Sequence, residues 1–185
     1  MLNSWFKKFG TKAFLLFIWA MLILAISAMP ASAEYPPKTL QTLLDRAQIE
    51  DLLTDYYAQL GTGGRNFSDF YVEDGILDVN GLIAQGKKPI EDLYKKGAQE
   101  SPARKGTFRM LLTNIKIVVN GSSATADVIW TGVNSETVKS VPQFIEQGRE
   151  HDELVKRNEK WYFKHRIITA DGGLSGFWEK TYKPR

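Results

Sequence analysis

The sequence predicts an α+β fold in which a cone-shaped, strongly curved antiparallel sheet wraps around a long N-terminal helix. Between Leu40 and Leu60, apolar residues recur mostly at a spacing of three or four, which is the period of an amphipathic helix. Between Phe108 and Thr169, the apolar period shortens to two, which is typical of strands with one buried face. Helices followed by an antiparallel meander form α+β domains, and a strongly bent sheet leaves an open mouth for a small apolar ligand.

Residues 1–33 have the order of an export signal. Three lysines precede a largely apolar run from Ala13 to Met29, and Ala31-Ser32-Ala33 supplies the small residues of a cleavage site. We therefore expect cleavage after Ala33 and an exported protein, either periplasmic or secreted. The alternative is an uncleaved single-span anchor, and only then do we expect contact with a membrane.

Charge and composition exclude several classes of protein. Three of the 24 basic side chains lie in residues 1–33, and none of the 21 acidic ones does, so the remaining chain carries 21 of each. A chain without net positive charge is a poor binder of phosphates, so we expect no nucleic-acid partner. The absence of cysteine excludes disulfides and thiolate metal sites, and we expect neither a metal nor a cofactor.

The first half of the remaining chain is predicted to be mainly helical. Pro36-Pro37 indicates an extended linker over residues 34–39, and Gly61-Thr62-Gly63-Gly64 ends the long helix. The elements expected next are a short helix at 66–71, a strand at 76–79 closed by Asn80-Gly81, and a helix at 89–96.

The second half is predicted to form two hairpins. Asn120-Gly121 joins strands at 108–119 and 124–133, and Asn158-Glu159-Lys160 joins strands at 149–157 and 161–169. We assign residues 40–170 to one domain. We expect the aromatic tail at 171–185 to pack on the mouth of the cone or on the partner of a dimer.

Motifs spread over residues 44–169 resemble those of SnoaL-like proteins in the nuclear transport factor 2-like superfamily. They are Asp45-Arg46-Ala47-x-Ile49-x-Asp51-Leu52-Leu53-x-x-Tyr56, Phe70-Tyr71-x-x-Asp74-Gly75, Leu111-Leu112-Thr113-Asn114, Asn120-Gly121-x-x-Ala124-x-Ala126, Asp152-Glu153-Leu154-Val155 and Trp161-x-Phe163-x-x-Arg166. The resemblance implies the cone-shaped fold and a homodimer that pairs through the open face of the sheet. It leaves the function open, because this fold hosts dehydratases, isomerases, epoxide hydrolases, cyclases and proteins that only bind.

The chain departs from the catalytic pattern of these relatives. Many SnoaL-like enzymes use an Asp and a His, and the corresponding positions here are Gly61 and Met110, neither of which carries a proton. Ketosteroid isomerases use a Tyr on the first helix to donate to an enolate oxygen, and Tyr56 matches that position. Their base aligns near Val79, one residue from Asp78, and an offset of one turns a strand side chain to the other face.

Tyr56, His151 and His165 are the main catalytic candidates, with Asp55 and Arg109 as further ones. Tyr56 shares a helix face with apolar residues and is expected to point into the cone as an oxyanion donor. Counting outward from the 158–160 loop places Glu153 opposite His165, and we expect this cluster to move a proton. Arg109 faces the cone only if a bulge turns it inward. The ligand-binding candidates are Tyr57, Phe108, Met110, Trp130 and Trp178.

Three functions remain open on the sequence. The first is a cofactor-independent lyase, dehydratase or isomerase that acts on a small apolar or aromatic molecule. The second is a module that binds such a molecule without catalysis. The third is an assembly partner that uses an apolar patch on the outer sheet face.

Overall fold

The computed structural model describes residues 36–60, 66–101, 104–174 and 176–181, which belong to one compact unit that begins at Pro36. The expected signal, Gly61 to Gly64 and the last four residues lie outside the described residues. The helices are α2 (Leu40–Ala58), the 3-10 helix η1 (Phe67–Phe70), α3 (Lys87–Glu100) and the 3-10 helix η2 (Gly176–Thr181). The strands are β1 (Tyr71–Val79), β2 (Leu82–Gln85), β3 (Thr107–Asn120), β4 (Ser123–Ser135), β5 (Gln143–Arg157) and β6 (Lys160–Gly172). Within this part of the chain, no helix has the length and apolarity to span a membrane.

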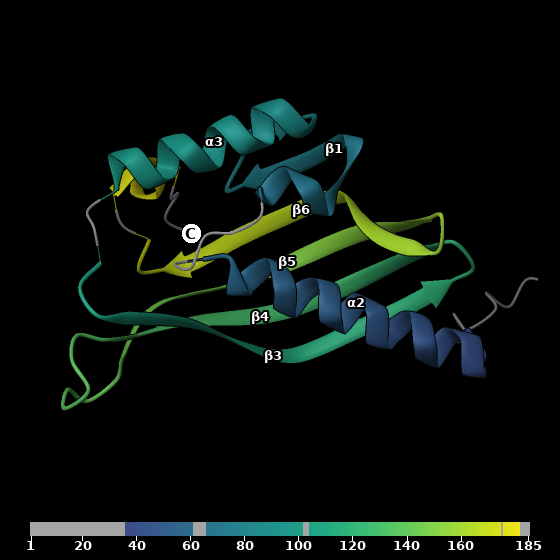
Figure 1. Ribbon diagram of the computed structural model, residues 1–185, viewed down its shortest axis with the longest axis horizontal. Helices are drawn as coiled ribbons and strands as arrows, with labels where there is room; N and C mark the ends of the chain where they lie inside the picture. The colour runs from purple at the N-terminus through teal and green to yellow at the C-terminus, as the bar shows by residue number, and fades with distance from the viewer. Residues whose placement is uncertain (1–35, 61–65, 102–103, 175, 182–185) are drawn as a thin grey trace, which may run out of the picture. The chain divides into compact units, whose positions relative to one another are not determined.

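The six strands form one curved sheet in the order β2-β1-β6-β5-β4-β3, and Figure 1 shows α2 lying across one face of it. The α+β class with a sheet around the long helix is therefore confirmed. Four of the five strand pairs are antiparallel, and the β1–β6 pair is parallel. The parallel pair arises because the chain passes through β2, α3 and the β3–β5 meander before β6 returns beside β1.

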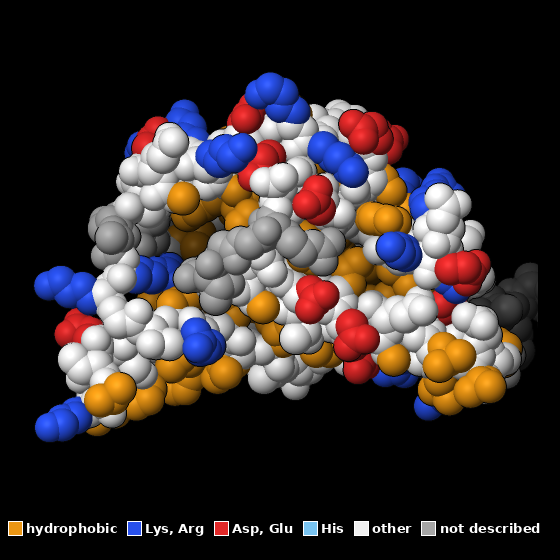
Figure 2. Space-filling model, in the orientation of Figure 1, with side chains coloured by type: hydrophobic (Ala, Val, Ile, Leu, Met, Phe, Trp, Pro, Cys, Tyr) orange, Lys and Arg blue, Asp and Glu red, His pale blue; other side chains and the backbone are white. Residues whose placement is uncertain are grey.

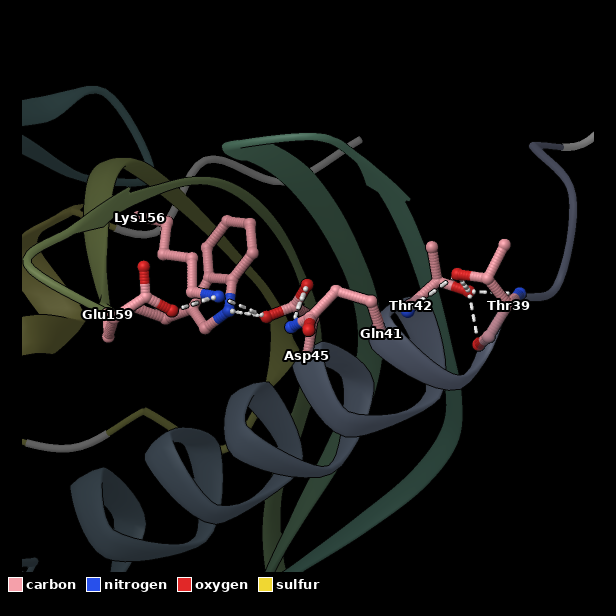
Figure 3. Close-up of polar contacts among 7 residues, drawn as sticks. Thr39, Gln41, Thr42, Asp45, Lys156 and Glu159 are labelled. Carbon is pink, nitrogen blue, oxygen red and sulfur yellow. Dashed lines mark hydrogen bonds and ion pairs between the residues drawn. The ribbon is translucent and has the colours of Figure 1, made fainter.

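A buried carboxylate fixes α2 to the β5–β6 hairpin (Figure 3). Asp45 is only 3% exposed, and it accepts hydrogen bonds from Trp161 Nε1 at 3.1 Å and Lys156 Nζ at 2.9 Å. Burial alone raises the pKa of Asp45, but the hydrogen bonds from Lys156, Trp161 and Gln41 outweigh it and lower the pKa. Thr39 caps the start of the helix by accepting from the backbone N–H of Thr42.

The β5–β6 hairpin has a shorter turn than predicted. Arg157 pairs with Lys160, so Asn158 and Glu159 form a two-residue turn with positive φ at both positions. A bulge after Glu153 adds one residue on β6, so Glu153 still pairs with His165 as predicted. The shorter turn and the extra residue of the bulge each shift the register by one, in opposite directions, so the predicted pairing of Glu153 with His165 is kept.

The same bulge reverses the facing of β6. Trp161 and Phe163 are buried on the inner face, but beyond the bulge Arg166 is the buried residue. His165 therefore points to the opposite face. Regular alternation along the strand would place Trp161, Phe163, His165 and Ile167 on one face, but the bulge shifts the alternation by one residue and turns the last two outward.

Candidate functional site

A cavity of about 680 Å³ lies between the inner face of the sheet and the helices α2 and α3. Figure 2 shows a hollow beneath α3 with hydrophobic side chains inside it. This volume is within the range of pockets that hold drug-sized ligands, roughly 300 to 1,000 Å³. The lining includes Tyr56, Tyr57, Tyr94, Phe108, Met110, Trp130, Glu146 and Trp178.

Two glycines make room for large side chains in the sheet wall. A Cβ at Gly148 of β5 would lie 2.3 Å from the Trp130 ring of β4. A Cβ at Gly132 of β4 would lie 2.5 Å from Cγ of Glu146 and 2.8 Å from the Phe108 ring. All three distances are far shorter than a van der Waals contact, so Trp130 and Glu146 occupy their places only because these strand positions lack side chains.

The C-terminal helix η2 packs on α3 at the cavity. The Trp178 ring packs directly against Gly97 of α3, where an added Cβ would lie only 2.7 Å from the ring. Both residues line the cavity. The Phe177 backbone N–H donates to Ser101 Oγ at 3.3 Å and holds η2 against the end of α3. The described part of the tail therefore supplies one wall of the cavity.

Two tyrosine hydroxyls meet in the cavity wall. The hydroxyls of Tyr56 and Tyr94 are within hydrogen-bond contact of each other. The guanidinium of Arg166 lies 3.8 Å from the centre of the Tyr56 ring. Burial raises the pKa of Tyr56 to about 12, and Arg166 opposes this only in part. Tyr56 therefore keeps its proton at neutral pH.

A buried charged cluster joins α2, β5 and β6. Glu150 Oε2 accepts hydrogen bonds at 2.5 Å from both Arg166 Nη2 and the Tyr57 hydroxyl. Arg166 Nε lies 3.6 Å from Asp152 Oδ1, and the side chains of Arg166, Glu150 and Asp152 are 0% exposed. Burial raises the pKa of Asp152 well above its usual range, Glu150 raises it further, and Arg166 opposes the shift. The arrangement favours a neutral Asp152 beside the Arg166 guanidinium.

Glu146 adds a carboxylate to the cavity wall. Its side chain is 8% exposed, and Arg104 Nη2 donates to its Oε2 at 2.6 Å. Burial raises the pKa of Glu146, while Arg104 acts in the opposite direction. The Arg104 guanidinium also stacks 3.9 Å above the Phe108 ring, which holds it at the rim.

The structure brings most of the predicted site residues to this cavity. Tyr56, Tyr57, Phe108, Met110, Trp130 and Trp178 line it. Arg109 borders it, but its side chain is exposed and donates to the Phe108 carbonyl at 2.9 Å. No bulge turns Arg109 inward, because the irregularity in β3 falls later, between Thr113 and Lys116.

Three predicted catalytic residues lie away from the cavity. Asp55 is exposed on α2, displaced around the helix from Tyr56. His151 is exposed on the outer sheet face, with Nδ1 2.6 Å from Asp127 Oδ1. His165 faces outward because the bulge in β6 shifts the alternation of side chains by one residue. The expected acid–base cluster of the two histidines and Glu153 therefore does not face the ligand cavity.

Sequence reasoning missed Tyr94, Glu146 and the Glu150–Asp152–Arg166 cluster. Charged residues occupy both sets of alternate positions in β5, so the period of two carries no signal there about which face is buried. The run of Glu146, Gly148, Glu150 and Asp152 at every second position is the inner face. Among the described residues, no three His, Cys, Asp or Glu side chains gather in a way that could hold a metal ion.

The family assignment follows from the sequence match. The SnoaL-like domain matches residues 41–167, which is more than half of the chain, and the chain therefore belongs to the SnoaL-like domain family. A search of curated proteins finds no significant match.

Solved structures share the fold of this chain. A cystatin-like protein of unknown function from Nostoc punctiforme is 26% identical with a TM-score of 0.61, over 71% of this chain and 94% of that one. A protein from Novosphingobium aromaticivorans, provisionally named a scytalone dehydratase, is 18% identical with a TM-score of 0.58, over 78% of this chain and 91% of that one. ActVI-ORFA from Streptomyces coelicolor is 18% identical with a TM-score of 0.58, over 68% of this chain and 96% of that one. The last two proteins are only 18% identical to this chain, so their similarity shows a common fold alone.

Proposed function

We propose that this protein is a cofactor-independent enzyme that moves a proton on a small apolar or aromatic molecule, as a lyase, dehydratase or isomerase does. The observation that carries the proposal is the hydroxyl pair of Tyr56 and Tyr94 in the wall of an aromatic cavity. The provisional scytalone dehydratase name of one structural neighbour agrees with this class of reaction.

The tyrosine pair suits the stabilisation of an oxyanion. Two hydroxyls that share one hydrogen bond leave one proton for a ligand oxygen, and the bond between them polarises that proton. The Arg166 charge behind the Tyr56 ring favours negative charge developing at the hydroxyl. Because the pKa of Tyr56 is about 12, the phenol donates a hydrogen bond to an enolate without losing its proton at neutral pH.

Hydrogen–deuterium exchange tests this function without knowledge of the natural substrate. The protein is incubated in D2O with 1-tetralone, an aromatic ketone with exchangeable α-hydrogens, and NMR follows deuterium incorporation at that carbon. We expect the wild type to accelerate exchange and Tyr56→Phe to lower the rate by about 100-fold, within the usual range of acid–base contributions. Tyr162→Phe on β6, which does not line the cavity, is the matched control.

A wild-type rate equal to that of buffer, with tetralone and related aromatic ketones bound in the cavity, would contradict the proposal. That result would favour the second candidate, a module that binds without catalysis. One observation favours it: Met110 lines the cavity where the family resemblance implies a catalytic His. For such a binding module we expect aromatic ketones to bind without hydrogen exchange. Tyr56→Phe should then cause only a small loss of affinity.

We further propose that the mature protein begins at Glu34, is exported and forms a homodimer. Residues 1–33 support the export proposal by their order of lysines, apolar run and small residues. Exposed Leu111 and Ile129 on the outer sheet face support a dimer or another assembly there. Denaturing and native mass spectrometry test both: a chain that retains Met1 contradicts cleavage, and a monomer at micromolar concentration contradicts the dimer.

A further inference from the structure

Glu146 is the one carboxylate among the described residues that line the cavity. Its side chain is almost completely buried, yet it belongs to the cavity wall rather than to the sealed core. The two histidines expected to move a proton lie on the other face of the sheet. If the cavity is catalytic, the group that accepts a proton has to be sought among its own lining residues.

Local strand geometry aims Glu146 into the cavity. It pairs with Gly132, and the register shifts at the next pair, where Val133 lies opposite Phe144. Ile145 is the extra residue of this bulge, and bulges re-aim neighbouring side chains. The missing Cβ of Gly132 then leaves the space that Cγ of Glu146 occupies.

Trp130 lies diagonally across β4 and β5 from Glu146 on the same inner face. Trp130 pairs with Gly148, while Glu146 pairs with Gly132, so each large side chain packs over the glycine of the opposite strand. The Trp130 Nε1–H is buried and has no hydrogen-bond partner among the described residues. An unpaired buried donor in a cavity wall is costly unless a ligand atom accepts from it.

We propose that Glu146 is the general base of this site and that its substrate is an aromatic or other apolar carbonyl compound whose oxygen accepts the Trp130 N–H. The inference rests on the proposed function and names its base and its substrate class. Arg104 is a positioning residue that holds Glu146 through one guanidinium nitrogen.

The proposed step is an enolisation. A proton passes from the carbon next to the carbonyl to a carboxylate oxygen of Glu146, and the C–H electron pair forms the new C=C bond. The carbonyl π pair moves to oxygen, where the Trp130 N–H and the tyrosine hydroxyl pair stabilise it. Glu146 then returns the proton to carbon, at the same or a conjugated position, so no oxidant, reductant or cofactor is consumed.

The other ionisable side chains that line the cavity do not change their charge between pH 4 and 8. They are Arg104 beside it, Arg109 at the rim, and Tyr56, Tyr57 and Tyr94 on the helices. Arginine stays charged and tyrosine neutral in this range. Buried Asp152 on the same face of β5 has a raised pKa, so only the part of the pH-dependent affinity that Glu146→Gln abolishes reports the Glu146 carboxylate. Burial and Arg104 act in opposite directions on the pKa of Glu146, with burial the larger effect.

Binding of 2-naphthol measures this carboxylate without turnover. The naphthol resembles an aromatic enol: its hydroxyl donates to an ionised Glu146, and its oxygen accepts from Trp130. We expect its affinity by calorimetry to rise about tenfold from pH 4 to pH 8, as for a hydrogen bond to a charged group. Glu146→Gln should abolish the rise, 2-methoxynaphthalene should show none, and the exposed strand control Glu73→Gln should behave as wild type.

Arg104→Gln provides a second variant at an exposed position. Because Arg104 lowers the pKa of Glu146, its removal should shift the midpoint of the pH-dependent affinity to higher pH while the fold is unchanged. This keeps the inference testable if Glu146→Gln fails to fold, which circular dichroism would show. An unmoved midpoint would overturn the assignment of the titration to Glu146.

The tetralone exchange assay separates this inference from the proposed function. We expect Glu146→Gln to lower the exchange rate by about 100-fold and Glu73→Gln to leave it unchanged. A Glu146→Gln rate equal to wild type, with Tyr56→Phe still inactive, overturns Glu146 as base and keeps the enzyme. No exchange by wild type, with a naphthol affinity that still depends on Glu146, overturns the proposed function and the base together.

Discussion

Both faces of the sheet hold basic and acidic side chains in close contact, but in very different surroundings. On the inner face, Arg166 lies between Glu150 and Asp152, and all three side chains are 0% exposed. On the outer face, His151 and Asp127 lie 2.6 Å apart with side chains 47% and 52% exposed. Similar distances thus join groups in water and groups in the protein interior, and the surroundings decide what each pair contributes.

The inner cluster of Arg166, Glu150 and Asp152 costs free energy to bury, and removing one of its members costs free energy as well. Desolvating charged groups consumes most of their mutual attraction, so such a cluster adds little net stability. Removing one partner, however, leaves an uncompensated charge in a medium of low polarity. The outer pair is hydrated in the folded and unfolded chain alike, so its loss changes little.

The largest effect is expected for Arg166→Met. Glu150 and Asp152 would remain buried without a cation, so the free energy of unfolding should fall by about 3 to 5 kcal/mol. Urea denaturation followed by tryptophan fluorescence measures the change. Arg149→Met, which removes an exposed pair with Asp171 at 2.7 Å, is the matched control and should cost at most about 1 kcal/mol.

A rescue variant sharpens this comparison. Arg166→Met combined with Glu150→Gln removes the cation together with the carboxyl group that it contacts at 2.5 Å, and most of the lost stability should return. If the single variant is no less stable than Arg149→Met, the inner face does not hold its charges as the structure indicates.

Asp45→Asn should have an intermediate effect, because Asp45 is buried but its partner Lys156 also pairs with Glu159 near the surface. The pKa of Asp45 is lowered in the folded state, so the stability that it contributes is present above about pH 4 and is lost as the pH falls through the folded pKa. We expect a loss of about 1 to 2 kcal/mol at pH 7 that shrinks toward zero at pH 2.

Thermal unfolding of wild type and Asp45→Asn at several pH values checks this. The difference between the two curves, rather than either curve alone, isolates the Asp45 contribution. A constant difference from pH 7 to pH 2 would mean that the asparagine acts by altered packing and not by the lost charge.

The smallest effect is expected for His151→Gln. Its ring lies on the outer face against Asp127, so stability should change by less than about 0.5 kcal/mol, and the tetralone exchange rate should equal that of wild type. Loss of exchange in this variant would place the reactive groups on the outer face and reverse the roles of the two faces.

The fold was predictable because its signals are local. The spacing of apolar residues in α2 and the Asn120-Gly121 turn specify a helix and a hairpin without knowledge of the rest of the chain. The aromatic part of the site was predictable for the same reason, since Phe108, Met110 and Trp130 fall on the apolar face of β3 and β4.

The charged part of the site was not predictable from alternation alone. Bulges at Glu153 and beside Glu146 shift which residues face inward, and nothing in the residues next to them announces a bulge. The inner face of β5 carries carboxylates, which sequence reasoning assigns to the surface unless a buried partner is known. That partner, Arg166, comes from the neighbouring strand.

The glycines beneath Trp130, Glu146 and Trp178 determine how this site can be redesigned. Each already presents the smallest possible residue, so every substitution at Gly132, Gly148 or Gly97 can only take space away. A library intended to accept bulkier ligands should therefore hold these three positions constant and vary the aromatic residues that rest on them. The backbone at these glycines limits the size of the pocket, and the side chains packed against them determine which ligands fit.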